Sequence, residues 1–167
     1  MAAPDLTSSI FVKLPSKGAP SPALLLAIKN AEKHTFPTSE QFDFDSEIPK
    51  RTTNLYCLYA KGTSNQSNII LYGYVVFLRS KALTRIHKVC VVESMRGQGI
   101  GTYMMKKIVT ELKKGGADQV DLWVDEARAP ARALYTNCGF VEIEKVTDYY
   151  GKGRTGIRMK LELYDFS

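Results

Sequence analysis

The sequence is poor in the residues that build metal centres and disulfide frameworks. It has three cysteines and two histidines among 167 residues. The cysteines, Cys57, Cys90 and Cys138, are widely spaced, and none forms a Cys-x-x-Cys pair or a metal-ligand spacing with His34 or His87. We therefore expect no bound metal and no disulfide.

Long apolar runs are also missing, and so are the features of a secretory signal. The apolar segment 23–28 is far too short to span a bilayer, which takes about 20 residues. The first residues do not combine a basic region with a following apolar core. From this we expect a protein without membrane association, located in the cytoplasm, with the nucleus as an alternative.

The charge balance is basic, with 23 Lys and Arg against 17 Asp and Glu, a net charge of +6. Such a charge suits nucleic acid, an anionic membrane or an anionic cofactor. No basic stripe interleaved with aromatic residues is present, which argues against nucleic acid. The densest basic group favours an anionic cofactor, although its last two members also fit a solvated helix face: Arg96, Lys106, Lys107, Lys113 and Lys114.

The length and the hydrophobic fraction of 44% fit one globular domain over residues 1–167 with a substantial core. Prolines and a glycine make residues 1–20 partly irregular, apart from a candidate first strand at 9–14. Ser21-Pro22 begins a helix over 23–34 with Leu25, Ile28 and Ala31 inward, and Phe36-Pro37 ends it. Residues 37–52 are predicted as a short helix or loop that borders the substrate.

Strand and helix patterns alternate in the rest of the chain. Strands 54–60 and 68–78 form a hairpin around 62–67, and a further strand covers 82–92. A helix follows over 101–114, and its buried stripe comprises Ile100, Met104, Ile108 and Leu112. The remaining predicted elements are strand 120–124, helix 129–137, a strand beginning at 138–141 and a last strand at 156–163. This order predicts a mixed α/β domain.

The segment Arg96-Gly97-Gln98-Gly99-Ile100-Gly101 lies between a predicted strand and a predicted helix. Glycines allow positive φ and a close approach to an anion, and a helix start offers unpaired N–H groups, so the segment can cradle a diphosphate. It is not a P-loop, which needs Gly-Lys before Ser or Thr, and the dinucleotide fingerprint lacks its third glycine. An ordinary glycine-rich turn is the alternative.

This Arg-x-x-Gly-x-Gly pattern resembles the acetyl-CoA loop of the GNAT superfamily of N-acetyltransferases. A second motif, Ala131-x-x-Leu134-Tyr135-x-x-x-Gly139-Phe140, is similar to the fourth helix and following strand of the same superfamily, and it follows at the family's spacing. The resemblance covers residues 70–163. It implies the GNAT fold, with a central, mixed, mostly antiparallel sheet and helices on both faces.

The resemblance also implies acetyl-CoA as co-substrate and assigns its contacts. The strand before the loop receives the pantetheine arm and the acetyl carbonyl, and the loop amides hold the diphosphate. Arg128 stands where the family usually has an Asn that contacts the cofactor, and an Arg there is suited to a phosphate instead. The cofactor-binding residues are then Val89, Cys90, Val91, Arg96, Gly97, Gln98, Gly99, Ile100, Gly101, Thr102 and Arg128.

Tyr135 is implied to face the thioester sulfur. A phenol has a pKa of about 10 and a thiol about 8.5, so full proton transfer to the departing thiolate is not downhill, but a concerted donation still stabilises it. We therefore predict Tyr135 as a catalytic residue. The alternative is a tyrosine that packs under Phe140 with its hydroxyl merely satisfied.

The general base is not where related enzymes place it. They often have Glu or His at the position of Trp123, and an indole cannot accept a proton. His87 lies at even spacing from Val89 and Val91, so we predict that it shares their strand face and acts as the catalytic base. A histidine hydrogen-bonded within the sheet is the alternative.

Asp148-Tyr149-Tyr150, predicted in the turn before the last strand, resembles the paired tyrosines with which protein N-terminal acetyltransferases hold a peptide. The closest likeness is to the ribosomal-protein alanine type. Tyr149 and Tyr150, with Trp123 and Glu32, are the predicted substrate-binding residues; an aromatic pair packed beside Phe140 is the alternative. At pH 7 deprotonation costs an α-amine about 1.4 kcal/mol and a lysine-like amine about 4.6, so a site without a strong base favours an α-amine.

Three functions therefore stay open. The first is acetyl transfer to a peptide or protein N-terminus, and the second is acetylation of a small amine such as a polyamine or an arylalkylamine. The acidic residues Glu40, Asp43, Asp45 and Glu47 would attract such a cation. The third is a non-catalytic acetyl-CoA-binding subunit, suggested by Trp123 and Arg128. A homodimer is a further predicted partner arrangement.

Overall fold

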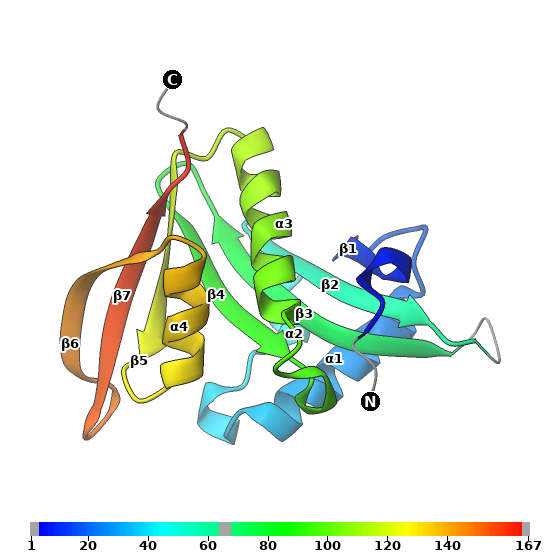
Figure 1. Ribbon diagram of the computed structural model, residues 1–167, viewed down its shortest axis with the longest axis horizontal. Coiled ribbons are helices and arrows are strands. Elements are labelled where there is room, and N and C mark those ends of the chain that lie inside the picture. Colours follow the sequence, from blue (N-terminus) through cyan, green and yellow to red (C-terminus); the bar gives the residue numbers. More distant parts are fainter. Residues whose placement is uncertain (1–3, 64–67, 165–167) are drawn as a thin grey trace. The chain divides into compact units, whose positions relative to one another are not determined.

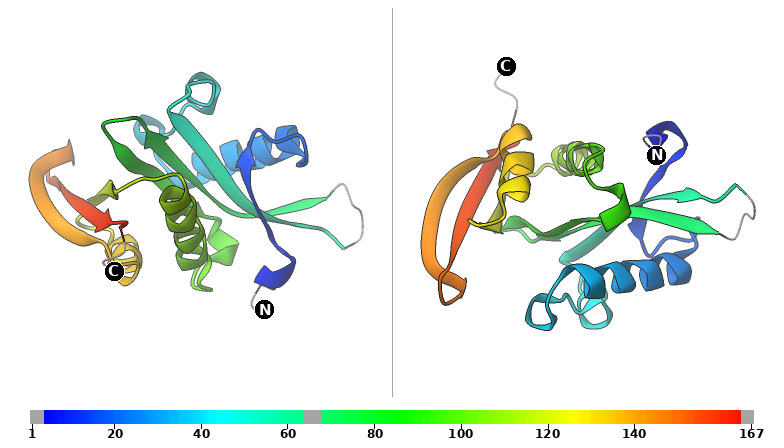
Figure 2. Two further views of the ribbon diagram at one scale, coloured as in Figure 1. Left: turned by 90° about the horizontal axis from the view of Figure 1, so that it is seen from above. Right: turned by 60° about the horizontal axis from the view of Figure 1, so that its bottom comes forward.

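The computed structural model describes residues 4–63 and 68–164. Figure 1 and Figure 2 show their helices and strands. The N-terminal half contains η1 (Leu6–Ser8), β1 (Ile10–Leu14), α1 (Ser21–Thr35), η2 (Thr38–Glu40), α2 (Phe44–Glu47), β2 (Thr53–Lys61) and β3 (Ile69–Arg79). The C-terminal half contains β4 (Thr84–Val91), η3 (Glu93–Met95), α3 (Ile100–Lys114), β5 (Gln119–Asp125), α4 (Ala129–Asn137), β6 (Val141–Gly151) and β7 (Arg154–Glu162).

Seven strands within the described residues form one mixed sheet in the order β1-β2-β3-β4-β5-β7-β6. β4 and β5 pair in parallel, with Arg85 opposite Asp121. Three neighbouring pairs are antiparallel: β1 with β2, β5 with β7, and β6 with β7. The predicted mixed, mostly antiparallel fold with helices is therefore confirmed.

The predicted elements are present, and two of them differ in detail from the expectation. In α1 the buried side chains are Leu24, Ile28 and Glu32, whereas Leu25 and Ala31 are only partly buried. The strand expected from residue 138 begins at Val141, because residues 138–140 end the preceding helix. Gly62 N–H bonds to the Asn68 carbonyl at 2.6 Å, which closes the predicted hairpin, and residues 64–67 of its turn lie outside the described residues.

The chain groups into two compact units. The first comprises Met1–Phe77 and Lys88–Met104, and the second comprises Leu78–His87 and Met105–Ser167. The expectation of a single domain over 1–167 stays a prediction.

The core of the first unit lies between α1 and one face of its strands, an arrangement that Figure 2 shows for β1 to β3. Its members are apolar side chains that α1, the segment after it and the strands direct inward. They are Leu14, Leu24, Ile28, Phe36, Phe44, Leu55, Cys57, Tyr59, Leu71, Tyr74, Val76 and Cys90. Burial of this set supplies the main stabilisation of the unit.

In the second unit, β5 alternates between an apolar face and a polar one. Val120, Leu122 and Val124 are buried, as the period of two in a strand requires, and they leave Asp121 and Trp123 on the opposite face. The part of α3 in this unit buries Met105, Ile108 and Leu112. The predicted helix stripe of Ile100, Met104, Ile108 and Leu112 is confirmed, since each of these side chains is at most 1% exposed.

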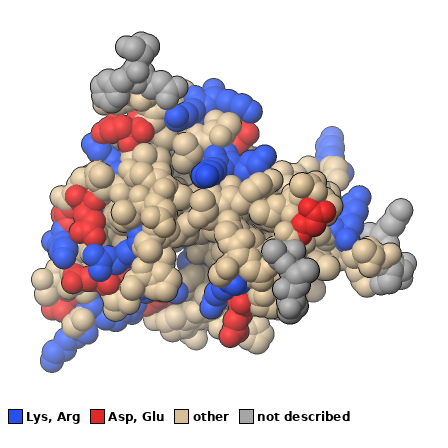
Figure 3. Space-filling view, in the orientation of Figure 1, with Lys and Arg blue, Asp and Glu red and all other residues tan. Residues whose placement is uncertain are grey.

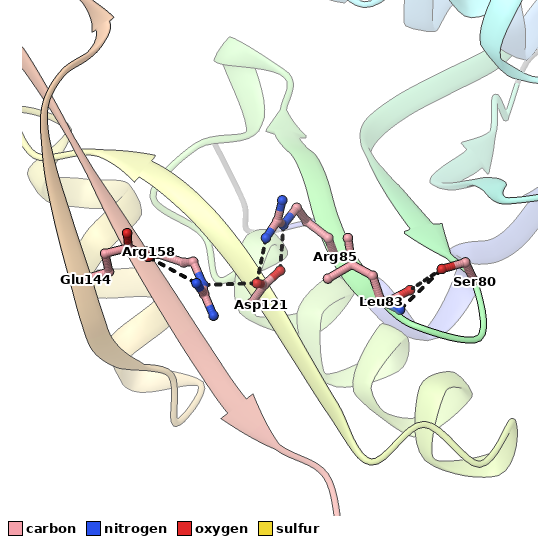
Figure 4. A network of polar contacts seen from close by, with 6 residues as sticks. All are labelled: Ser80, Leu83, Arg85, Asp121, Glu144 and Arg158. Atoms are coloured by element: carbon pink, nitrogen blue, oxygen red, sulfur yellow. Dashed lines mark hydrogen bonds and ion pairs between the residues drawn. The ribbon is translucent and has the colours of Figure 1, made fainter.

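A network of charged side chains links the strands of the second unit (Figure 4). Arg85 donates to both carboxylate oxygens of Asp121, at 2.7 and 2.8 Å, and Arg158 lies 3.2 Å from the same carboxylate. Arg158 also donates to Glu144 at 3.0 Å. Because the Asp121 side chain is only 8% exposed, its charge needs these partners. At the end of β3, Ser80 Oγ accepts the Leu83 N–H at 3.2 Å and stabilises the turn into β4.

Strand β6 lies at an edge of the sheet and carries a mixture of charges. Figure 3 shows basic and acidic side chains side by side over β6 and β7. Arg132 pairs with Glu142 at 2.8 Å, and Lys145 pairs with Glu126 at 3.7 Å. Alternating charges of this kind disfavour the addition of a foreign strand. No helix in the described part of the chain is long and apolar enough to cross a membrane.

Gly73 in β3 marks a close approach of two strands of the first unit. A Cβ at this position would lie 2.5 Å from the Cys90 carbonyl oxygen and 2.8 Å from the Met104 side chain. We predict that Gly73→Ala lowers the free energy of unfolding by roughly 1–3 kcal/mol, because strand β4 must shift. Urea unfolding measures this. Gly18→Ala, where a Cβ meets nothing within 4 Å, is the control; equal stability of the two variants would contradict the prediction.

Candidate functional site

The glycine loop lies in the first unit, between β4 and the start of α3. Gly97 has φ 74° and Gly99 has φ 79°, both in the left-handed region that disfavours residues with a Cβ. A Cβ at either position would meet no atom within 4 Å. The glycines are therefore required by backbone conformation, and the space beside them stays open to a ligand.

Backbone N–H groups gather at the start of α3. The Tyr103 N–H donates to the Gly99 carbonyl at 3.0 Å, a first-turn bond of the helix. The N–H groups of Ile100, Gly101 and Thr102 precede it and have no acceptor within the helix. Together with the helix dipole they form a site suited to an anion.

The loop is fixed to the strands beside it. Arg96 donates from Nε to the Val91 carbonyl at 3.1 Å, and the Val92 N–H donates to the Tyr72 carbonyl at 2.9 Å. The side-chain oxygen of Gln98 is buried and meets no donor among the described residues. A preformed loop with an unsatisfied polar atom fits a ligand that carries phosphates and hydrogen-bond donors, as acetyl-CoA does.

The last residues of β4 divide between two faces. Lys88 contacts Glu32, and Cys90 lies 3.7 Å from the Thr35 hydroxyl, so both side chains face α1. By strand alternation Val89 and Val91 point the other way, and they are partly buried. The predicted pantetheine contacts would therefore come from the side chains of Val89 and Val91 and from the backbone of Cys90. These contacts stay predictions.

Tyr135 lies in α4 of the second unit and is only 8% exposed. Burial raises the pKa of its phenol to about 12, and the nearby Arg128 charge opposes that shift. Its ring meets Phe140 edge-on, with centroids 6.0 Å apart. The hydroxyl therefore keeps its proton throughout the neutral range, as a proton donor must.

The local sequence explains how α4 presents these side chains. Arg128 is the N-cap residue of the helix and is exposed. Gly139 ends the helix with φ 96°, and the Phe140 N–H returns to the Tyr135 carbonyl at 3.0 Å. This C-terminal turn needs a residue without a Cβ, which accounts for the glycine in the motif.

The predicted acceptor residues Trp123, Tyr149 and Tyr150 lie together in the second unit. The Trp123 and Tyr149 rings stack with centroids 4.1 Å apart and 10° between their planes. Tyr150 meets Tyr149 edge-on at 4.9 Å. A Cβ on Gly156 would lie 2.6 Å from the Tyr149 ring, so this glycine leaves room for the stack.

One expectation about this aromatic group is corrected. Tyr149 and Tyr150 lie within strand β6 and not in the turn before β7, because β6 continues to Gly151 after a residue, Asp148, with φ 60°. The ring contacts join the pair to Trp123. Packing of the pair beside Phe140 stays an alternative. Tyr149 remains 44% exposed, so its ring is available for further contacts.

The other predicted residues are placed as follows. His87 is exposed and is the last residue of β4 that belongs to the second unit. Its role as the base stays a prediction. Glu32 is 2% exposed in the first unit and is engaged by several donors, so its role as a substrate contact also stays a prediction. Within residues 4–63 and 68–164, no group of three or more His, Cys, Asp or Glu side chains is placed to hold a metal ion.

Sequence reasoning missed three residues that shape these groups. Lys88 and Tyr74 contact Glu32, and Gly156 underlies Tyr149. The sequence does indicate the burial of Glu32, because it follows Leu24 and Ile28 at four-residue spacing and so lies on the buried face of α1. No pattern in the sequence pairs Gly156 with a tyrosine seven residues earlier.

Comparison with known proteins agrees with this geometry. The model of the acetyltransferase (GNAT) family matches residues 25–140. N-alpha-acetyltransferase 30 of Xenopus laevis is 35% identical over 78 residues, which are 47% of this chain and 29% of that protein. N-alpha-acetyltransferase MAK3 of Arabidopsis thaliana is 28% identical over 71 residues, 42% of this chain and 37% of that protein. The matched segments thus span well under half of these relatives.

Solved structures share the fold at low sequence identity. The ribosomal-protein-S18-alanine N-acetyltransferase of Escherichia coli superposes with a TM-score of 0.73 at 18% identity, over 95% of this chain and 96% of that one. The NatC complex bound to Gag peptide and CoA gives 0.75 at 16% identity, over 94% and 99%. Since the family model matches more than half of the residues, the chain belongs to the acetyltransferase (GNAT) family, a family of acyltransferases.

Proposed function

We propose that the protein transfers the acetyl group of acetyl-CoA to the α-amine of a peptide or protein N-terminus. The observation that carries the proposal is the loop of Gly97 and Gly99, left-handed at both glycines and followed by the unpaired N–H groups of α3. Such a loop binds a diphosphate through its backbone. Membership of the acetyltransferase family supports coenzyme A as the source of that diphosphate.

The reaction needs one nucleophile and one proton donor. The neutral α-amine nitrogen attacks the thioester carbonyl, the C–N bond forms and the C–S bond breaks. The proton of the amine passes to His87, the predicted base, and the departing thiolate takes a proton. Tyr135, whose phenol stays protonated because burial raises its pKa to about 12, supplies the hydrogen bond or the proton to the sulfur.

Three features favour an α-amine as the acceptor. Trp123 stands where relatives carry a base, and an α-amine loses its proton at neutral pH far more readily than a lysine. The exposed Tyr149 ring on Trp123 offers an aromatic surface to a peptide. Two of the relatives by sequence are N-alpha-acetyltransferases.

A small-amine acceptor is the second candidate, and a structural likeness keeps it open. The spermidine/spermine N-acetyltransferase of Vibrio cholerae superposes with a TM-score of 0.69. The acidic residues that would attract such a cation are, however, largely engaged. Asp45 pairs with Lys29 at 2.7 Å, Glu47 pairs with Lys50, and Asp43 caps α2 through Ser46 N–H. This weakens the case for a polyamine.

Acceptor choice is tested with purified protein, acetyl-CoA and three kinds of amine. They are a peptide with a free N-terminus and blocked lysine, a peptide with a blocked N-terminus and free lysine, and spermidine or tryptamine. We expect acetylation of the first alone, measured by mass spectrometry and thiol release. Acetylation confined to lysine or to small amines would refute the α-amine proposal, and binding without turnover on any amine would favour a non-catalytic subunit.

Gly99→Ala tests the loop. With a Cβ, the φ of 79° costs about 1–2 kcal/mol. If the loop must keep this conformation to bind, the dissociation constant for acetyl-CoA rises by about tenfold. Calorimetry measures it, with Gly18→Ala as the control at an ordinary glycine. An unchanged affinity of Gly99→Ala would argue against the loop as the diphosphate site.

Tyr135→Phe tests the proton donor. We expect kcat to fall by about 10²-fold while acetyl-CoA affinity stays within twofold, since only a hydroxyl is lost. Because the pKa of Tyr135 is raised, its donor form persists as the pH rises, and the wild-type rate shows no decline between pH 7 and 10 from this group. Tyr164→Phe, at a half-exposed tyrosine, is the control. Wild-type kcat in Tyr135→Phe would refute this role.

A further inference from the structure

A buried carboxylate at the end of α1 gathers donors from three other parts of the first unit. The Glu32 side chain accepts from the Tyr74 hydroxyl of β3 and from the Lys88 ammonium of β4. It also accepts the Phe42 N–H at 2.8 Å. Glu32 is 2% exposed, so water screens these electrostatic contacts only weakly.

Lys88 is the second centre of this cluster, with a side chain only 9% exposed. Besides Glu32 its ammonium donates to the Glu40 carbonyl at 2.7 Å. It also lies 3.7 Å from the centroid of the Phe36 ring, a cation–π contact. A buried ammonium with these three partners is held in one position.

The segment 36–42 receives contacts from both members of the pair. Glu32 holds its Phe42 N–H, and Lys88 holds its Glu40 carbonyl and its Phe36 ring. Apart from the single turn η2, the segment has no helix or strand of its own. Side-chain contacts therefore contribute much of what fixes its backbone.

Lys88 adjoins the expected acetyl site along β4, on the face of the strand that meets α1. Lys88 precedes Val89 in β4, where the acetyl carbonyl and the pantetheine arm are expected to bind. Residues 37–52 are the segment expected to border the substrate. The contact between Lys88 and Glu40 thus fixes the distance between this segment and the strand that is expected to present the acetyl group.

We propose that Glu32 and Lys88 are positioning residues for the acceptor: together they hold segment 36–42 at a fixed place against β4, so that an incoming amine meets the thioester in a productive orientation. The inference rests on the proposed function and deepens it. Glu32 then acts through this segment and not as a substrate contact.

The test separates positioning from folding. Replacing a buried ion pair by apolar residues of similar volume is often neutral for stability, whereas removing one partner leaves an unpaired charge. The variant is therefore Glu32→Leu/Tyr74→Phe/Lys88→Met, which removes the cluster as a whole. Lys29→Met, which breaks the exposed Lys29–Asp45 pair between α1 and α2, is the matched control.

We expect the triple variant to unfold cooperatively and to bind acetyl-CoA within twofold of wild type. Its kcat/KM for the acceptor peptide should fall by about tenfold or more, because misplaced reactants lose rate steeply. Exchange of the Phe42 amide hydrogen, followed by NMR, should become faster, since that amide has lost its acceptor. The control should change neither quantity.

A triple variant with wild-type kcat/KM for the acceptor and wild-type Phe42 exchange would overturn the proposal. If the triple variant does not unfold cooperatively, Glu32→Leu/Lys88→Met takes its place under the same criteria, because it removes both charges and the acceptor of the Phe42 N–H and leaves Tyr74 unchanged. A wild-type protein inactive on every amine would refute the proposed function instead. The Phe42 exchange would then still decide whether the pair holds the segment.

Discussion

A buried carboxylate must accept hydrogen bonds and pair with a positive charge, because it has lost its contact with water. Glu32 is such a carboxylate in the first unit. Its donors come from β3, from β4 and from the segment after α1. These elements are far apart in sequence and each must keep its place for the charge to remain paired.

The order of elements could be predicted because most of them follow simple periodicities. The stripe of Ile100, Met104, Ile108 and Leu112 is apolar at every member and identifies its helix directly. In α1 the same method selected Leu25 and Ala31, since it looked for apolar residues. The buried face contains Glu32. A search for apolar residues at helical spacing passes over a charged residue, even where its spacing is regular.

The candidate site divides in the same way. The glycine loop could be predicted, because left-handed backbone and an unpaired helix start depend on residues adjacent in sequence. The stack of Trp123 with Tyr149 could not, since it depends on the register of β6 against β7 and on the irregularity at Asp148. The contact of Lys88 with Glu32, 56 positions earlier, could not be predicted either. Contacts set by register and by tertiary packing leave no local pattern.

Trp123 is the single tryptophan of the sequence, and its ring lies against a half-exposed tyrosine instead of in a core. Its emission therefore reports on the aromatic face of the second unit. Any molecule that settles on Tyr149 alters the surroundings of this indole. The chain thus contains an intrinsic optical probe at the surface where its aromatic residues gather.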